Sequence, residues 1–213
     1  MTYTVKELYY TLQGEGARTG TPAAFLRFAG CNLWSGRESD RAAAACSFCD
    51  TDFIGTDGPG GGKFASAKSL AAAVEAAWPG AAGDRRYVVC TGGEPLLQLD
   101  APLIDALHQA GFEIGVETNG TIMAPDGIDW LCVSPKGSAP VIQRAGNELK
   151  LVYPQVEEEA QPENFAELPF EHFFLQPLYS PQRQANTQAA VRYCLEHPRW
   201  RLSLQTHKLI GIP

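Results

Sequence analysis

Three cysteines in one stretch of the sequence offer thiolate ligands for a metal centre. Two residues separate Cys46 from Cys49, so both thiolates can bind one centre, and Cys31 precedes them with fourteen residues between. Such a set suits a cubane iron–sulfur cluster in which one iron has no protein ligand and stays open to a substrate or cofactor. Three thiolates and a histidine would instead form a closed zinc site, although no histidine lies near this segment. The spacing alone leaves iron–sulfur and zinc open.

The other three cysteines each lie among apolar residues in a predicted strand or helix. They are Cys90, Cys132 and Cys194. Free cysteine is among the most buried residue types and packs as a small hydrophobe. We therefore expect these three to belong to the core. Disulfide frameworks are typical of small secreted chains, so all six thiols are expected to be reduced.

An arginine inside an apolar segment is the second candidate for chemistry. Arg27 is flanked by Leu26 and Phe28, where an unpaired guanidinium would carry a heavy desolvation cost. It requires an anion, which is either a structural carboxylate or a substrate carboxylate held by two parallel hydrogen bonds. The residues alone leave both interpretations open.

Strands and helices that alternate along the chain must position these residues. Short runs rich in Val, Ile, Leu and Phe alternate with Ala-rich or Leu-rich segments of helical period, as in strand–helix units around a parallel sheet. The predicted strands span 23–29, 87–90, 112–117, 130–133, 148–152, 172–176 and 201–205. The predicted helices span 67–78, 96–110 and 187–197, the last capped by Asn186. We expect an α/β fold, an incomplete TIM-like barrel with about six parallel strands.

Two glycine-containing segments interrupt this pattern. Segment 55–63 is too glycine-rich to form the interior of an element, so we expect a mobile loop or the tip of a hairpin. Gly92 and Gly93 directly follow a predicted strand, where the absence of side chains would let the backbone approach a ligand closely. Neither segment resembles a linker, and 213 residues with 45% hydrophobic side chains suit one domain over residues 1–213.

Charge and hydropathy exclude several classes of function. A net charge of −7 and a pI near 5.1 oppose the basic surface that binds a phosphate backbone, so no nucleic acid partner is expected. The N-terminal residues lack the pattern of a signal peptide, and no apolar run approaches the roughly 20 residues that span a bilayer. We therefore expect a cytoplasmic protein without membrane association.

Several motifs together resemble the radical S-adenosylmethionine superfamily. They occur in the order Cys31, Cys46-x-x-Cys49, Thr91-Gly-Gly-Glu-Pro95, Glu117-Thr-Asn-Gly120 and Ser134-Pro-Lys136. Within it the sequence resembles the 7-carboxy-7-deazaguanine synthase family, through Tyr10-Thr-Leu-Gln-Gly-Glu-Gly16, Phe25-Leu-Arg-Phe-Ala-Gly-Cys31 and Gln205-Thr-His-Lys208. The superfamily usually has three residues between its first two cluster cysteines. Residues 32–45 therefore resemble an insertion that some synthases carry.

The resemblance implies a [4Fe-4S] cluster on Cys31, Cys46 and Cys49, with S-adenosylmethionine beside it. The residues implied to bind this cofactor are Phe48, Cys49, Asp50, Gly93, Ser134, Pro135, Lys136, Gln176, Pro177, Leu178 and Tyr179. Phe48 would stack on the adenine, since a flat apolar ring suits base stacking. Thr51 would help to hold Mg²⁺, which accepts a neutral hydroxyl because it keeps several waters and takes substrate oxygens.

A second group of residues is implied to surround the substrate. Those implied to bind it are Leu12, Gln13, Gly14, Arg27, Thr91 and Pro213, and those implied to act in catalysis are Arg27, Glu15 and Glu117. The resemblance favours a substrate carboxylate as the partner of Arg27. An apolar C-terminal segment is expected to dock on the body, which would bring the Pro213 carboxylate to the donor edge of a pterin ring. Alternatively, Leu209, Ile210 and Ile212 only cover the core edge or a dimer surface.

The implied reaction converts 6-carboxy-5,6,7,8-tetrahydropterin into 7-carboxy-7-deazaguanine, with ring contraction and loss of ammonia, on the route to queuosine. One electron from the cluster would cleave S-adenosylmethionine, and the resulting 5′-deoxyadenosyl radical would take hydrogen from the substrate. The implied partners are the pterin substrate, a reductant such as a flavodoxin or ferredoxin, and a second copy in a homodimer. Two other functions stay open, an activating enzyme that acts on a partner protein and a zinc-binding interaction module.

Overall fold

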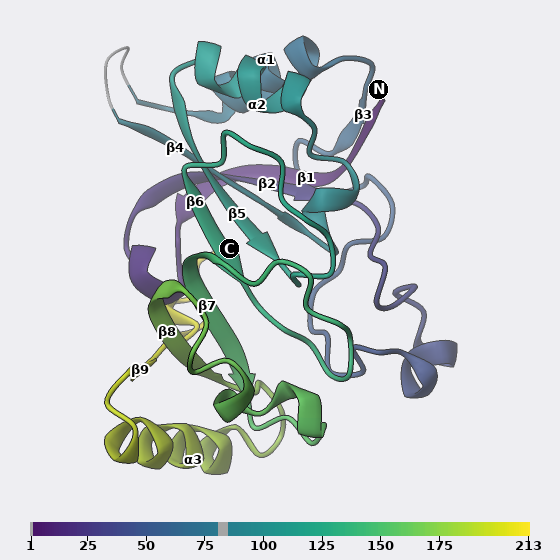
Figure 1. Ribbon diagram of the computed structural model, residues 1–213. Coiled ribbons are helices and arrows are strands. Elements are labelled where there is room, and N and C mark those ends of the chain that lie inside the picture. The colour runs from purple at the N-terminus through teal and green to yellow at the C-terminus, as the bar shows by residue number, and fades with distance from the viewer. Residues whose placement is uncertain (1, 81–84) are drawn as a thin grey trace.

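One β-sheet runs through the computed structural model, which describes residues 2–80 and 85–213 (Figure 1). The strands of this described part follow the order β3-β1-β2-β4-β5-β6-β7-β8-β9 across the sheet. They are β1 (Tyr3–Leu12), β2 (Pro22–Phe28), β3 (Gly62–Phe64), β4 (Arg86–Gly92), β5 (Phe112–Thr118), β6 (Trp130–Val133), β7 (Gly146–Tyr153), β8 (Phe170–Pro177) and β9 (Trp200–Leu202).

Parallel pairing joins β2 to β4 and continues strand by strand from β4 to β9. The strand β1 is antiparallel to both of its neighbours, β2 on one side and β3 on the other. Among the described residues β3 and β9 are the two free ends of the order, so the sheet is open. The predicted α/β fold with an incomplete barrel is confirmed, with seven strands in the parallel set where about six are expected.

Helices cover the sheet from outside. They are α1 (Ala67–Ala77), α2 (Ala101–Gln109), α3 (Arg183–Glu196) and α4 (Thr206–Ile210), with 3-10 helices at Gly16–Arg18, Glu38–Ala43, Pro95–Leu97, Glu158–Ala160 and Pro162–Asn164. In Figure 1, α1 and α2 lie together over one end of the sheet, whereas α3 packs beside β8 and β9 at the other end. No helix of the described residues is long and apolar enough to cross a membrane.

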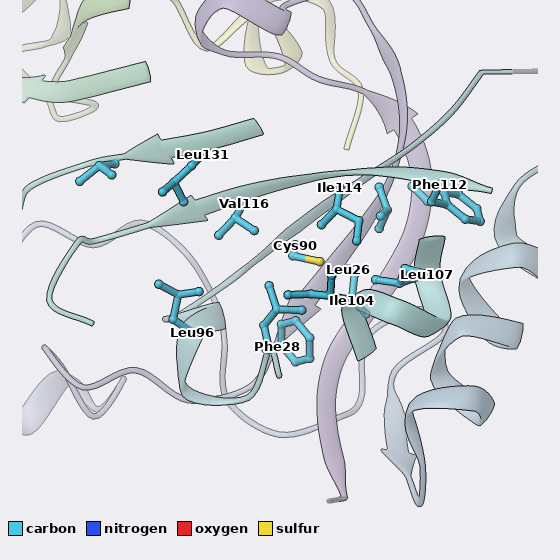
Figure 2. Close-up of a cluster of buried hydrophobic side chains, with 14 of the residues drawn as sticks. Leu26, Phe28, Cys90, Leu96, Ile104, Leu107, Phe112, Ile114, Val116 and Leu131 are labelled. Carbon is cyan, nitrogen blue, oxygen red and sulfur yellow. The ribbon is translucent and has the colours of Figure 1, made fainter. Parts of the chain in front are cut away.

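The main core lies between the sheet and α1 and α2. Figure 2 shows Leu26, Cys90 and Val116 of three neighbouring strands facing Ile104 and Leu107 of α2. All five side chains are buried. Parallel strands covered on both faces are expected to be continuously apolar, which is why the sequence pattern predicts them well. The prediction that Cys90 packs in the core is confirmed.

The predicted helix 96–110 is wrong, because this segment forms two elements. The 3-10 helix Pro95–Leu97 ends before Asp100, whose carboxylate accepts a hydrogen bond from the Leu103 backbone N–H at 3.1 Å. Pro102 then lies in the first turn of α2, where a missing N–H costs no hydrogen bond. An N-terminal cap therefore interrupts the apolar period that continues through both elements.

The predicted helix 187–197 begins four residues early, at Arg183. Asn186 therefore lies inside α3 and does not cap it. Its side-chain amide donates instead to the Leu178 carbonyl at 2.9 Å and to the Ser180 hydroxyl at 3.1 Å. These two hydrogen bonds tie the start of α3 to the turn that follows β8.

The sequence does not predict β1, β3 or α4. In β1 the charged residues Lys6 and Glu7 interrupt the apolar pattern, and a bulge at this position shifts the register of the strand. The glycine-rich segment that we expect to be mobile is held against this strand, since the Gly58 N–H donates to the Lys6 carbonyl at 3.0 Å. The glycine-rich segment leads into β3.

The predicted strand 201–205 is shorter in the structure, since β9 ends at Leu202.

Replacing Asp100 by alanine should remove the cap of α2 and the acceptor of the buried Tyr3 hydroxyl, which lies 2.6 Å away. We expect the free energy of unfolding to fall by about 1–3 kcal/mol, since a lost cap and an unsatisfied hydroxyl both contribute. Urea denaturation measures this change. Asp105→Ala, on the exposed side of α2, is the matched control, and its effect should stay below about 0.5 kcal/mol. Equal losses in the two variants would contradict the capping role.

Candidate active site

A cavity of about 450 Å³ opens at the edge where the parallel strands end. Residues near the carboxyl ends of β4, β5, β7 and β8 line it, including Thr91, Glu117, Val152 and Gln176. Loops from neighbouring strands converge at this edge, which is where barrel-like α/β enzymes bind their ligands. The volume also lies within the roughly 300–1,000 Å³ of small-molecule sites.

All but one of the predicted site residues line this cavity. Those that do are Leu12, Gln13, Gly14, Glu15, Arg27, Cys31, Cys46, Phe48, Cys49, Asp50, Thr51, Thr91, Gly93, Glu117, Ser134, Lys136, Gln176, Pro177, Leu178, Tyr179 and Pro213. The exception is Pro135, which is buried and whose carbonyl accepts a hydrogen bond from the Gln155 amide at 3.3 Å. The fold therefore gathers segments from the whole length of the chain at one place.

The three cysteines all line the cavity from the connection between β2 and β3. Cys31 follows the end of β2, whereas Cys46 and Cys49 lie in the loop between β2 and β3. A hydrogen bond between the Cys46 and Cys49 thiols lowers the pKa of Cys49 to about 6 and raises the pKa of Cys46. Burial raises the pKa of Cys31. One thiolate is thus stabilised beside two further thiols.

This donor set fits an iron–sulfur cluster. Soft thiolate ligands suit iron–sulfur clusters, zinc and copper(I). Among the described residues, no group of three or more His, Cys, Asp or Glu side chains is arranged to hold one metal ion. A cubane does not need its ligands to converge on one atom, because each cysteine binds a different iron. Three thiols around one cavity therefore suit a [4Fe-4S] cluster in which one iron has no protein ligand.

Gly92 and Gly93 join the end of β4 to the turn that carries the first cysteine. A Cβ on Gly92, where φ is +149°, would lie 2.4 Å from the Phe28 carbonyl oxygen, and a Cβ on Gly93 would lie 2.2 Å from that of Gly30. We expect glycines here to permit close approach to a ligand. The close approach that the structure shows is to the chain's own backbone, while Gly93 also lines the cavity.

Glu94, in the same motif, is fully buried and ties β4 to the end of β5. Its carboxylate accepts hydrogen bonds from the Leu96 N–H at 3.0 Å, the Thr118 hydroxyl at 2.8 Å and the Asn119 N–H at 2.8 Å. The Asn119 amide donates in turn to Asn32 at 3.0 Å, directly after the first cysteine. Glu94 therefore positions the turn and does not line the cavity.

A buried lysine that the sequence analysis does not single out forms the floor of the cavity. The Lys150 ammonium donates to Glu15 at 2.6 Å and to Glu117 at 2.9 Å. Burial by itself would lower the pKa of Lys150, but the acidic groups around it raise that pKa well above its usual value. Burial would likewise raise the pKa of Glu15, but Lys150 lowers it to about 2. The three side chains form a charged group in which Lys150 is buried and the two carboxylates are partly exposed to the cavity.

Amide side chains hold the other oxygens of both carboxylates. The Gln13 amide donates to Glu117 at 3.2 Å, and the Gln205 amide donates to Glu15 at 3.0 Å. With one oxygen on Lys150 and the other on an amide, each carboxylate has a fixed orientation. We call Gln13, Glu15, Glu117, Lys150 and Gln205 the acidic floor.

A signal in the sequence could have found Lys150. Glu148 and Lys150 alternate on one face of a strand that is otherwise apolar, and the desolvation argument applied to Arg27 holds for them as well. Glu148 is buried, accepts a hydrogen bond from the Ala17 N–H at 3.0 Å, and has its pKa raised by burial. Its carboxylate lies 3.6 Å from the Cys132 thiol, so this cysteine is buried as predicted but beside polar groups.

Arg27 lines the cavity and also has a structural carboxylate partner. Its Nε donates to Glu7 at 2.7 Å, and its Nη2 donates to the Tyr9 hydroxyl at 3.3 Å. This is the ion pair that the sequence analysis left open as an alternative. A guanidinium has five N–H donors, so the pair with Glu7 leaves donors for a second anion in the cavity.

Polar residues after β6 and β8 complete the wall beside the cysteines. The Lys136 ammonium donates to the Ser134 carbonyl at 2.9 Å, and its positive charge opposes the rise in the pKa of Cys46. Gln176 accepts a hydrogen bond from the Ser203 hydroxyl at 3.1 Å. Phe48 is half-buried and lines the cavity between the two cysteines of its loop.

Residues of the C-terminal segment also line the cavity. The Thr206 N–H donates to the Gly14 carbonyl at 2.9 Å, which holds α4 against the segment after β1. Lys208 forms an ion pair with Asp50 and lies 3.9 Å above the Tyr179 ring. The sequence does not predict these contacts, because α4 is short and lacks a marked apolar period.

Pro213 lies at the cavity, where its carbonyl oxygen accepts a hydrogen bond from the Thr11 hydroxyl at 3.1 Å. The expected docking of this segment is thus seen in the structure. Leu209 and Ile210 are 62% and 57% exposed, so within this chain they do not cover the edge of the core.

Comparisons with known proteins show which family this chain resembles. The model of the radical SAM superfamily matches residues 39–147. The 7-carboxy-7-deazaguanine synthases of Caulobacter vibrioides and Bordetella pertussis are 67% and 66% identical to this chain, and each alignment covers both proteins completely.

A solved structure extends the agreement to the fold. The crystal structure of QueE from Escherichia coli superposes with a TM-score of 0.73 at 30% identity, covering 97% of this chain and 95% of that one. Sequence and fold thus agree over the whole length of the chain. The chain belongs to the 7-carboxy-7-deazaguanine synthase family of the radical SAM superfamily.

Proposed function

We propose that this chain converts 6-carboxy-5,6,7,8-tetrahydropterin into 7-carboxy-7-deazaguanine with loss of ammonia. The observation that carries the proposal is a single cavity that joins three cysteines to the acidic floor. Full-length relatives named 7-carboxy-7-deazaguanine synthase support the same product. The conversion removes ammonia and nothing else, so it requires no net oxidant. A hydrogen atom taken from the substrate must therefore be returned within each turnover.

The family implies a [4Fe-4S] cluster and S-adenosylmethionine, which when bound supply the one-electron chemistry. In the proposed arrangement Cys31, Cys46 and Cys49 hold the cluster. The cofactor would contact Phe48 to Asp50, Gly93, Ser134, Lys136, and Gln176 to Tyr179, all of which line the cavity. Thr51 follows the last cysteine by two residues and offers a hydroxyl to Mg²⁺, together with oxygens of the substrate.

The acidic floor binds the donor edge of the pterin. Glu15 and Glu117 present fixed carboxylate oxygens to the amino group and the ring N–H, while Leu12, Gly14 and the Pro213 oxygen lie beside them. Because Lys150 lowers the pKa of Glu15 to about 2, this carboxylate is a weak base. It therefore serves as a hydrogen-bond acceptor that orients the ring, and it does not take up the proton that the substrate loses.

Arg27 holds the carboxylate of the substrate on the opposite side of the ring. Its ion pair with Glu7 orients the guanidinium, and Arg27 lines the cavity with N–H donors to spare. Thr91 lies at the end of β4, in register with Arg27 on β2, and supplies a further polar group. Anchoring both ends of the substrate restricts its motion, which is the protein's main contribution to a radical rearrangement.

The proposed partners are a one-electron reductant such as a flavodoxin or ferredoxin, and a second copy of the chain. The exposed apolar side chains Leu204, Leu209 and Ile210 support the homodimer. An activating enzyme that acts on a partner protein is not favoured, because the full-length relatives above carry the synthase name. A single radical SAM domain with the insertion 32–45 is proposed as the working unit.

The reaction itself tests the function. Reconstituted protein incubated anaerobically with dithionite, S-adenosylmethionine and 6-carboxytetrahydropterin should release 7-carboxy-7-deazaguanine and ammonia in equal amounts. Chromatography with mass spectrometry measures the product, and an enzymatic assay measures ammonia. Cleavage of S-adenosylmethionine without either product would refute the proposed substrate.

Replacing Cys31, Cys46 or Cys49 by alanine should abolish the cluster and all cleavage of S-adenosylmethionine, because each thiolate binds a different iron. Iron and sulfide analysis after anaerobic reconstitution measures the loss. Cys194→Ala is the control, since this thiol lies on α3 and is absent from the cavity lining. Full iron content in Cys46→Ala would overturn the assignment.

Arg27→Ala should weaken substrate binding at least tenfold, since truncating one partner of a buried charge pair typically costs about 2–5 kcal/mol. Binding of S-adenosylmethionine should change much less. Glu7→Gln is the matched variant, because it removes the structural partner but leaves the guanidinium in the cavity. Calorimetric titration of both variants measures the affinities. If Glu7→Gln loses as much substrate affinity as Arg27→Ala, the ion pair itself is what matters.

Lys150→Met should lower the free energy of unfolding by about 3–5 kcal/mol at pH 7, because two buried carboxylates lose their cation. In the parent, the pKa of Glu15 is about 2 in the folded protein and 4.5 in the unfolded chain. Its stabilising contribution is therefore complete above pH 4.5 and is lost as the pH falls toward 2.

Urea denaturation of Lys150→Met and the parent should thus give a smaller difference at pH 3.5 than at pH 7. Lys63→Met, on the exposed strand β3, controls for removal of a surface charge and should have little effect at either pH. A difference for Lys150→Met that does not vary with pH would contradict the role of Lys150 on Glu15.

A further inference from the structure

The segment between Cys31 and Cys46 makes direct contacts with the loop that carries the last two cysteines. Arg41 lies in the 3-10 helix Glu38–Ala43, inside this segment, which extends away from the sheet in Figure 1. Its Nη1 donates to the Ser47 carbonyl at 3.0 Å and to the Cys49 carbonyl at 2.9 Å. One guanidinium thus holds the backbone on both sides of Phe48.

Arg41 is itself held from two other directions. Glu38 accepts a hydrogen bond from Nε at 2.8 Å and from Nη2 at 2.6 Å, in the two-pronged geometry that guanidinium favours. The Trp34 ring lies 3.9 Å below the guanidinium carbon and packs edge-on against buried Phe53. The ion pair with Glu38, the Trp34 ring and the two backbone carbonyls together fix the Arg41 side chain in one orientation.

This position of Arg41 has an energetic consequence for the loop. Closing a fourteen-residue excursion so that its ends meet costs chain entropy. The excursion is rich in polar and small residues and, in the described structure, contributes Trp34 as its one buried aromatic side chain. The hydrogen bonds from Arg41 to the carbonyls of the cysteine loop offset part of that cost.

The charge of Arg41 has a second consequence. Arg41 lies close enough to Cys46 and Cys49 for their charges to interact. Lys136 adds a second positive charge near these thiols, whereas Asp50 and Glu94 lie near Cys49 and Cys31 as negative charges. Net charge and hydrogen bonding set the reduction potential of an iron–sulfur cluster. A reduced cluster carries one more electron, so a nearby positive charge favours it.

The partner of Arg41 does not cancel this effect. The Glu38 side chain is 76% exposed, against 29% for Arg41, so water and salt screen the charge of Glu38 more strongly. The hydrogen bonds of Arg41 also reach the cysteine loop directly, whereas those of Glu38 point back to Arg41.

We propose that Arg41 is a positioning residue for the cluster, which ties the insertion to the Cys46–Cys49 loop and holds a positive charge that raises the reduction potential. The inference rests on the proposed function, because it requires that the three cysteines hold a [4Fe-4S] cluster. It goes further because it assigns to the insertion a role in retaining the cluster and in setting the reduction potential of the cluster.

Three variants of the full chain test this inference after anaerobic reconstitution. Arg41→Gln removes the charge, Arg41→Lys keeps it but loses the planar fork, and Arg37→Gln removes an exposed charge from the same insertion as a control. Two quantities are measured besides turnover. They are the rate of iron release to a chelator and the midpoint potential, from a redox titration followed by electron paramagnetic resonance.

Arg41→Gln should release iron at least threefold faster than the parent and have a more negative midpoint potential. Arg41→Lys should also release iron faster, but its potential should stay near that of the parent because the charge remains. Arg37→Gln should match the parent in both measurements. If circular dichroism shows that Arg41→Gln does not fold, the test depends on Arg41→Lys, which should release iron faster than the parent at an unchanged midpoint potential.

Parental iron release and potential in Arg41→Gln would overturn the proposal, as would equal shifts in Arg37→Gln. Equal potential shifts in the Gln and Lys variants of Arg41 would overturn the role of its charge. A parent chain that binds no [4Fe-4S] cluster would refute the proposed function instead, before any variant is compared. The two failures are therefore distinguishable.

Discussion

The site depends on one buried cation, Lys150. Two carboxylates face the cavity at the end of the sheet, and without a positive charge between them they would repel each other. Lys150 lies in the middle of β7, and its ammonium forms ion pairs with both carboxylates. The orientations of Glu15 and Glu117, and with them the acceptor pattern offered to a substrate, follow from this one side chain.

The two halves of the cavity are built differently. In the acidic floor, Glu117 on β5 and Lys150 on β7 lie in the middle of the sheet, where strands pair on both sides, whereas Gln13, Glu15 and Gln205 come from the segments that follow β1 and β9. The cysteines stand on loops, and side chains hold those loops to the sheet and to each other. Gly92 and Gly93 allow β4 to pack against the turn before Cys31, and Arg41 ties the insertion to the loop of Cys49.

Most of the parallel strands could be predicted, because strands buried on both faces have continuous apolar runs. β1 could not be predicted in this way. Its charged residues Lys6 and Glu7 lie at a bulge, and their partners are distant in sequence, since the Lys6 ammonium pairs with Asp52 and Asp57 and Glu7 pairs with Arg27 on β2. The helix assigned across Asp100 is wrong for a related reason. The apolar period continues through the whole segment. The start of α2 is set instead by Asp100, which caps the helix and accepts a hydrogen bond from Tyr3, a residue distant in sequence.

The sequence by itself determined the fold class, the cysteine motif and more than half of the residues that line the cavity, because these depend on local apolar pattern and on motifs shared with a family. Only the tertiary structure decided which charges meet. Arg27 pairs with Glu7 across two antiparallel strands, and Lys150 meets Glu15 from a segment 135 residues away. Ion pairs inside a protein form between side chains that the fold brings together, and no local pattern along the chain records such distant partners.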